Sequence, residues 1–342
     1  MSTPSSPPPL PKRKSSRVAW ILVLLLAIGL FISVMMNIGL GLRAAFGAGW
    51  SDTQDIAVDE FPRFDEEWSF GSGTTKVVRL SLEGMIFRSI DTGWFGGSYD
   101  MTASLLAQIQ AAIQDPEVKA ILLEIDSPGG AVNPTDEIYR ALMAFRASAE
   151  GRVIVTHVRD MAASGGYYAA MASDWIYADP TAIIGSIGII MQTLNWHALS
   201  ERLGISDVTI KSGANKDMLN PFRESRPEEL ALLQDVVDDL HLRFVSIVSE
   251  ARGYTSEELT ALADGRVFTA PRALHHGLVD DIGTWRDATA KIAELLDVPE
   301  VRLIRYYRQA GFLDWLFRAR LPEPVRLLHP VQPPRFLYLW SP

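Results

Sequence analysis

The sequence predicts an α/β fold preceded by one transmembrane helix. β-rich runs alternate with helical runs over the middle of the 342-residue chain, a pattern typical of βαβ units. An uncharged apolar run covers residues 18–42. At 1.5 Å per residue this run is about 37 Å long, enough to cross a hydrocarbon core of about 30 Å.

The composition excludes several classes of function. The chain has 32 Lys+Arg against 41 Asp+Glu, and this net charge of -9 argues against a nucleic-acid partner. With 0 Cys, it has no disulfides, thiolate nucleophiles or thiolate metal sites. It contains no Walker A or H-E-x-x-H motif, so we expect no metal and no cofactor.

We divide the chain into five segments. They are a disordered Pro/Ser-rich tail (1–17), the transmembrane helix (18–42), a linker (43–73), a globular domain (74–308) and an Arg/aromatic-rich segment (309–342). Basic residues precede the apolar run and acidic residues follow it, which places the N-terminus in the cytoplasm and the domain outside. A cleaved signal peptide is the alternative, although its apolar region is normally shorter.

Within the domain we expect the following elements in order. Strands are predicted at 77–86, 120–125, 152–158, 175–178 and 208–210, with a Gly-punctuated run at 183–190; helices are predicted at 101–114, 135–149, just after 164, and at 196–203. A long helix opens at Arg226-Pro227-Glu228-Glu229, and its apolar stripe is core or a subunit contact. The C-terminal segment lies on a membrane, clasps a neighbouring subunit or stays disordered.

Ser164 lies among small residues in the run 161–168, between a predicted strand and a predicted helix. Such a turn leaves room for a substrate carbonyl beside the hydroxyl. The N–H of Gly165 lies at the helix start, where it is unpaired and can face an oxyanion. The alternative is a tight connection in which the serine only caps the helix.

A second turn follows the strand at 120–125, in the run Asp126-Ser127-Pro128-Gly129-Gly130. Gly130 is a candidate for the second oxyanion amide, because glycines free their backbone N–H groups here. The alternative is an ordinary turn between a strand and a helix.

A serine nucleophile needs a base, and the sequence offers few. The six histidines form no recognisable Ser-His-Asp motif, although sequence order alone does not exclude a triad. Beyond the N-terminal tail there are five lysines: Lys76, Lys119, Lys211, Lys216 and Lys291. Lys216 follows a predicted strand in a Gly-containing loop, from which it can reach a cleft; an exposed loop lysine is the alternative.

Together these features resemble the signal peptide peptidase A (protease IV) family, membrane-anchored serine peptidases with a Ser/Lys dyad on the ClpP/crotonase fold. The resemblance covers residues 77–283 and rests on six ordered motifs: DSPGG at 126–130, ASGGYY at 163–168, IGSIG at 184–188, KSGANKD at 211–217, ADGRV at 263–267 and GLVDDIG at 277–283. One catalytic repeat and one N-terminal anchor are similar to the short form of that family.

The resemblance implies a fold of repeated ββα units and assigns roles to five residues. Ser164 is the nucleophile, Lys216 the general base, Gly130 and Gly165 the oxyanion amides, and Ser186 a hydroxyl that orients the lysine. It also implies remnant signal peptides as substrates, a single-pass protein of the bacterial inner membrane, and homo-oligomers in which neighbouring subunits share the dyad.

The chemistry imposes one further expectation. A lysine base must be desolvated, because at its ordinary pKa of about 10.4 it is protonated at pH 7. A neighbouring carboxylate opposes this, so we predict that Asp217 points away from Lys216, into a backbone or Arg contact.

Three other functions remain open: a crotonase-like enzyme that stabilises a thioester enolate, a peptidase specific for one membrane protein, and an inactive oligomeric scaffold. The membrane anchor argues against a coenzyme A substrate.

Overall fold

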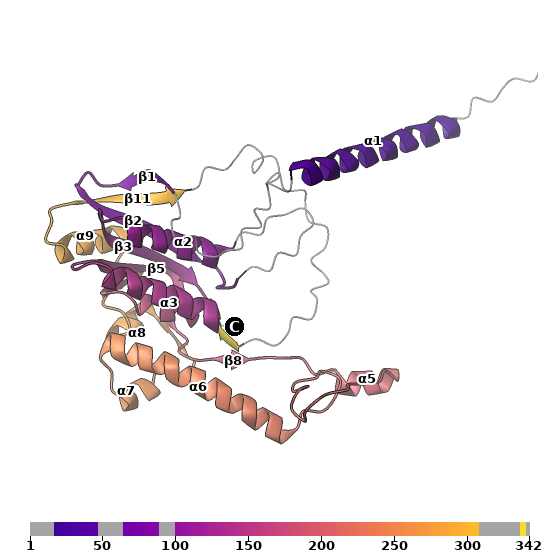
Figure 1. Cartoon of the computed structure of the whole chain (residues 1–342). Helices are drawn as coiled ribbons and strands as arrows, with labels where there is room; N and C mark the ends of the chain where they lie inside the picture. Colours follow the sequence, from indigo (N-terminus) through magenta and orange to yellow (C-terminus); the bar gives the residue numbers. More distant parts are fainter. Residues whose placement is uncertain (1–16, 47–63, 89–99, 308–335, 340–342) are drawn as a thin grey trace, which may run out of the picture. The chain divides into compact units, whose positions relative to one another are not determined.

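A computed structural model describes residues 17–46, 64–88, 100–307 and 336–339 of the chain (Figure 1). Its contacts divide into two units, Met1–Ala57 and Val58–Pro342. The described part of the first unit is helix α1 (Arg17–Phe46). The predicted tail (1–16 of it), most of the linker and most of the C-terminal segment lie outside the described residues.

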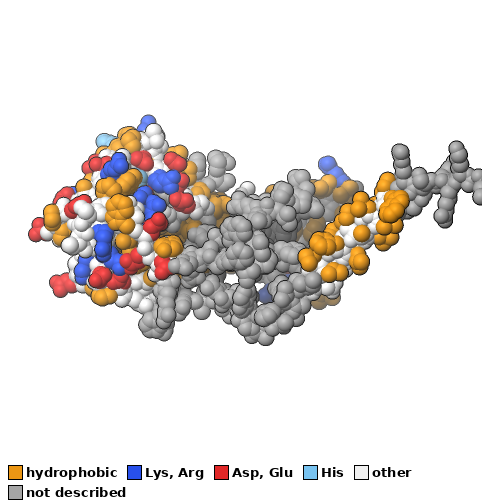
Figure 2. Space-filling model, turned by 90° about the horizontal axis from the view of Figure 1, so that it is seen from above, with side chains coloured by type: hydrophobic (Ala, Val, Ile, Leu, Met, Phe, Trp, Pro, Cys, Tyr) orange, Lys and Arg blue, Asp and Glu red, His pale blue; other side chains and the backbone are white. Residues whose placement is uncertain are grey.

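Helix α1 presents mainly hydrophobic side chains to its surroundings (Figure 2). Side chains are described for residues 20, 21 and 23–37 of this helix. Among the described residues, no helix combines the length and the hydropathy needed to cross a membrane. The transmembrane span at 18–42 therefore stays a prediction.

The second unit is built on a large mixed sheet. Its strands are β1 (Asp65–Phe70), β2 (Thr75–Glu83), β3 (Val118–Ser127), β5 (Val153–Ala163), β6 (Trp175–Ala178), β7 (Ile183–Gly185), β9 (Val267–Thr269), β10 (Asp281–Ile282) and β11 (Val301–Tyr307). The strand order is β1-β11-β2-β3-β5-β6-β10, and β7 pairs with both β5 and β9. From β11 to β10 the neighbours are parallel, and β1 is an antiparallel edge strand.

Helices cover both faces of this sheet. The helices of this unit are α2 (Met101–Gln114), α3 (Val132–Ala147), α4 (Gly165–Ala170), α5 (His197–Leu203), α6 (Pro227–Arg252), α7 (Ser256–Thr260), α8 (Ala270–His275) and α9 (Trp285–Leu295), of which α5 does not lie on the sheet (Figure 1). Successive residues of β2 point to opposite faces: Val78 packs in the larger core with α2 and α3, and Val77 packs in a smaller core against α9. This mixed α/β arrangement with a central sheet fits a ClpP/crotonase-like fold.

Local sequence explains the helices that were predicted well. Helix α2 occupies the predicted range 101–114, and it begins where the Asp100 carboxylate accepts a hydrogen bond from the N–H of Ala103 at 2.9 Å. Helix α6 begins with Pro227 at its first position, followed by Glu228 and Glu229 in the first turn.

The structure corrects the sequence prediction at two places. Residues 208–210 form no strand; Val208 is 84% and Ile210 97% exposed, and no described strand pairs with them. Apolar composition does not make a strand where no ladder partner lies alongside. Residues 65–70, assigned to the linker, form β1, because β11 offers them an edge and Phe70 packs edge-on against Trp285.

Residues 192–226 project from the sheet between β8 (Ile190–Met191) and α6, and we call this segment the arm (Figure 1). It carries α5 and the loop with Lys216. Ser200 is the only buried residue of this described segment. The predicted apolar stripe of α6 is core only in its second half, where Phe244 and Ile247 are buried, whereas Leu230 is 50% exposed.

Arg79 and Glu124 form a buried ion pair between β2 and β3, at 2.6 and 2.7 Å. Burial opposes ionisation of Glu124, but the His157 ring and the Arg79 guanidinium outweigh it and lower the pKa of this carboxyl from 4.5 to about 2. A lowered pKa stabilises the folded state above pH 4.5, and this contribution is lost as pH falls toward 2.

We predict that Arg79→Ala lowers the free energy of unfolding by about 3 kcal/mol at pH 7, because it removes the guanidinium partner of a buried carboxylate. The loss shrinks as pH falls through the acidic range. Arg159→Ala is the matched control: its pair with Glu83 is exposed, so it costs about 1 kcal/mol or less. Urea denaturation at several pH values measures both; equal losses for the two variants would contradict the interpretation.

Candidate active site

Ser164 connects β5 to α4 in a strained conformation. Its φ of 51° and ψ of -114° lie outside the regions that side chains favour, and its side chain makes no capping hydrogen bond. The residue is 1% exposed. Its hydroxyl lies 3.4 Å from the carbonyl oxygen of Gly188, toward which it donates. The hydroxyl of Ser164 therefore does not cap helix α4, as the hydroxyl of a purely structural serine would.

Ser186 occupies the equivalent position after the neighbouring strand. Strands β5 and β7 are parallel with Ala163 opposite Gly185, and the N–H of Ser164 donates to the carbonyl of Gly185 at 2.7 Å. Ser186 has the same φ of 51° and is 6% exposed. Two buried serines in a rare conformation thus follow adjacent strand ends.

Gly130 and Gly165, the two predicted oxyanion residues, lie against each other. Gly130 belongs to the short strand β4 (Gly129–Ala131) and Gly165 to the first turn of α4. A Cβ added to Gly165 would lie 3.2 Å from the backbone nitrogen of Gly130 and 2.8 Å from Oγ1 of Thr135. The carbonyl of Gly129 accepts from the N–H of Ile86, and the N–H of Ala131 donates to the carbonyl of Ile86. Because these groups alternate along a strand, the N–H of Gly130 points to the opposite side.

Lys216 lies in the arm and is exposed. Within the described residues, no hydrogen bond or ion pair joins it to Ser164. The structure therefore brings Ser164, Ser186, Gly130 and Gly165 together, and no described contact joins Lys216 to any of them.

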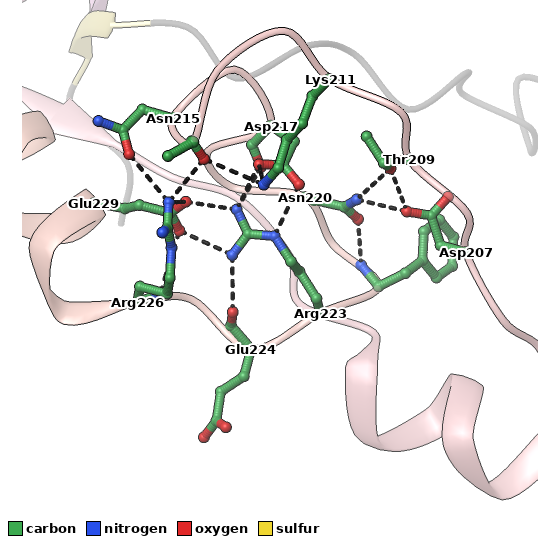
Figure 3. A network of polar contacts seen from close by, with 12 residues as sticks. Asp207, Thr209, Lys211, Asn215, Asp217, Asn220, Arg223, Glu224, Arg226 and Glu229 are labelled. Carbon is green, nitrogen blue, oxygen red and sulfur yellow. Dashed lines mark hydrogen bonds and ion pairs between the residues drawn. The ribbon is translucent and has the colours of Figure 1, made fainter.

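Asp217 points into an Arg contact, as predicted (Figure 3). Its carboxylate accepts hydrogen bonds from Arg223 at 3.1 Å and from Lys211 at 2.6 Å. These bonds, from Arg223 first and then Lys211, lower the pKa of Asp217 to about 2. The negative charge next to Lys216 in the sequence is thereby taken up by other cations.

The histidines supply no base for Ser164 in the part of the chain that the structure describes. His157 is 2% exposed and lies between Glu124 and Asp179, at 3.9 and 3.5 Å. It lines a polar cavity of about 540 Å³ beside α9 together with Arg79 and Trp285. In the described ranges, no group of three His, Asp or Glu residues is placed to hold a metal ion.

A second short sheet next to α4 was not predicted from the sequence. The C-terminal strand β12 (Phe336–Leu339) pairs antiparallel with β4 on one side and β8 on the other. Tyr338 lies opposite Gly130, so this strand runs along the edge that carries a predicted oxyanion amide. Its apolar residues were visible in the sequence, but nothing in them indicated which edge they would pair with.

The charged cluster that surrounds Asp217 was not predicted from the sequence beyond the expected Arg contact. Arg223, Arg226 and Glu229 join the Lys216 loop to the start of α6 (Figure 3). The acidic residues of the first helical turn were recognised only as favourable to the helix. Their partners became apparent only from the folded loop.

Comparisons with known proteins show which family this chain resembles. A model of peptidase family S49 matches residues 146–299. A protein of Enterococcus faecium named putative signal peptide peptidase SppA is 34% identical over 254 residues, 74% of this chain and 73% of the relative. A putative protease of Synechocystis is 36% identical over 69% of this chain and 81% of the relative. Protease 4 of Salmonella typhi is 33% identical over 82% of this chain but only 46% of its own length.

We predict that Gly165→Ala lowers labelling of Ser164 by a fluorophosphonate about 100-fold, because the new methyl pushes the two predicted oxyanion amides apart. The clash costs about 1 to 3 kcal/mol of stability. Labelling is measured by mass spectrometry of the intact protein. Thr135→Ala is the control, since it removes a hydroxyl without adding an atom near Gly130; a Gly165→Ala protein that labels as fast as this control would contradict the assignment.

Proposed function

Since this chain belongs to peptidase family S49 and is a serine peptidase, we propose that it is a membrane-anchored endopeptidase with a Ser164/Lys216 dyad. Its proposed substrates are remnant signal peptides or other peptides close to the membrane, outside the cytoplasm. One relative carries the name signal peptide peptidase, which supports this substrate class.

One observation carries the proposal: β12 fills a strand-wide space between β4 and β8, next to α4, the helix that Ser164 precedes. The space accepts an extended chain by main-chain pairing on both sides. A peptide bond held in this way passes the hydroxyl of Ser164 and the amides of Gly130 and Gly165. Unlike a thioester acyl group, a peptide matches a site that pairs with backbone.

The proposed reaction is acyl transfer. The neutral amine of Lys216 accepts the proton of Ser164 as Oγ bonds to the substrate carbonyl carbon. The amides of Gly130 and Gly165 stabilise the oxyanion, and the lysine ammonium then returns the proton to the leaving amine as the C–N bond breaks. Water, deprotonated by the same amine, releases the acyl group and restores the serine.

We propose that neighbouring subunits share this dyad. Lys216 is exposed and no described bond joins it to Ser164, whereas a base must be desolvated to lose its proton. The arm also exposes large apolar side chains, among them Leu203, Val208 and Ile210. A second copy that covers this apolar surface would bury the lysine and bring it to a serine.

The proposed anchor is the apolar run 18–42 within α1. The globular unit then acts outside the cytoplasm of a bacterial cell, at the inner membrane. Residues 74–308 form the proposed peptidase domain, with β1 added at its edge. This layout is supported by charge: basic residues precede the apolar run and acidic ones follow it.

We predict that Ser164→Ala and Lys216→Ala each lower kcat for fluorogenic peptides by about 1,000-fold, since each removes a group that handles the reacting proton or carbon. The full chain in detergent is assayed, with assembly checked by light scattering. If either folded and assembled variant kept normal turnover, the dyad would be wrong. An inactive unmodified assembly would favour a narrow substrate or a scaffold.

Co-assembly of the two inactive variants tests the shared dyad. When the two variants are mixed in equal amounts, about a quarter of sites pair an intact serine with an intact lysine from the next subunit, so a corresponding share of activity returns. Each variant assembled alone stays inactive. Mixed assemblies without activity would show that the dyad forms within one chain.

We further predict that deletion of residues 311–342 lowers the apparent KM for peptides about 10-fold, because it removes a competitor tethered at millimolar effective concentration. The rate at saturating peptide changes little. A synthetic peptide of residues 331–342 inhibits the shortened protein competitively. An unchanged KM together with intact assembly would show that β12 does not compete with substrate.

A further inference from the structure

We infer that Glu229 is a positioning residue, which fixes the loop of Lys216 through two arginines; the inference rests on the proposed role of Lys216. Without such a device the loop would have little to hold it. In the described arm every residue except Ser200 is at least partly exposed, so no apolar core packs beneath the loop. Polar contacts must define its conformation.

Glu229 is the fixed point of these contacts. It occupies the third position of α6 and has no exposed surface. Its Oε1 accepts from Arg223 and from Arg226, both at 2.6 Å, and its Oε2 accepts from Arg223 at 2.9 Å. These bonds lower the pKa of Glu229 to about 2, with Arg223 as the larger cause. The two guanidinium groups, rather than the core, cover the carboxylate.

The same two guanidinium groups hold the chain on both sides of Lys216 (Figure 3). Arg226 donates to the carbonyl of Ala214 at 2.8 Å and to the side chain of Asn215 at 3.0 Å. Arg223 donates to the carbonyl of Asp217 at 2.8 Å and to its carboxylate. Lys216 lies between these clamped residues, and no side-chain bond of its own is among the described contacts.

We call the arrangement of Glu229, Arg223 and Arg226 the clamp. Helix α6 connects it to the globular unit outside the arm, which we call the body. Its second half packs in the main core through Phe244, Ile247 and Val248. Arg252, at its last residue, forms a twofold ion pair with Asp280 at 2.8 and 2.9 Å. A 26-residue helix is a rigid rod of about 39 Å. The position of the Lys216 loop relative to the core is therefore fixed through α6 and Glu229.

A purely structural role makes a different prediction. Glu229 also accepts a hydrogen bond from the N–H of Arg226 at 3.3 Å, as a helix-capping residue does. If capping were its only role, its loss would lower stability and leave the rate of the folded enzyme unchanged. If it positions the base, kcat falls in protein that is still folded, because misplacement affects proton transfer more than peptide binding.

The experiment compares Glu229→Gln with Glu228→Gln in the full chain. Glu228 is the matched control: it is the adjacent residue, it is exposed, and it makes no contact in the cluster. We expect Glu229→Gln to lower kcat about 10-fold or more with KM within twofold, whereas Glu228→Gln leaves both within twofold. Hydrogen exchange of the amides in 211–217 should rise only in Glu229→Gln.

Arg223→Lys is the second variant, used in case Glu229→Gln fails to fold or assemble. It keeps the charge and loses the forked geometry that joins Glu229 to Asp217. A similar fall of kcat supports the inference. Unchanged kcat in folded Glu229→Gln, or in folded Arg223→Lys, overturns it. Lys216→Ala is assayed in parallel: if that variant keeps normal activity, the proposed dyad fails instead, independently of Glu229.

Discussion

The parallel pairing of β5 with β3 on one side and β7 on the other is the constraint on which the site depends. Parallel strands end at the same edge of a sheet, so the segments that follow them meet. These segments carry Gly130, Ser164 and Ser186. Glycine at 165 permits close approach to Gly130, and glycine at 130 permits close approach to Ile86. Four residues from three separate motifs are thus brought together by strand register and by these glycines.

The body and the arm are held in place by different interactions. In the body, strands such as β3 are apolar on both faces and their positions are fixed by packing. The arm has almost no buried residue, and its loop is ordered by charge, with Glu229 at the centre. A surface held by polar contacts can expose Val208 and Ile210 without collapsing onto the body. Such a segment is suited to reach another copy of the chain.

Sequence reasoning succeeded where the determining interactions are local. Helix α2 has a capping residue and a regular apolar spacing, so its range was predicted. The turn at Ser164 was identified from small residues after an apolar strand. The same reasoning failed where a partner is distant in sequence: residues 208–210 resemble a strand but have no neighbour, and β12 pairs with an edge about 200 residues earlier. The contacts of Glu229 with Arg223 were not predicted, because they depend on how the loop between the two residues folds.

Strain at Ser164 and Ser186 supports the assignment of this edge as the site of chemistry. Each serine has a φ of 51°, which costs about 1 to 3 kcal/mol in a residue with a side chain. If this turn served only to connect β5 with α4, glycine at position 164 would cost no stability, because glycine adopts a positive φ without strain. The serine at 164 is held instead by the bond from its N–H to Gly185, and its hydroxyl faces away from the helix cap. The surrounding sheet thus maintains a conformation that stability alone does not favour, which fits the nucleophile role proposed for Ser164.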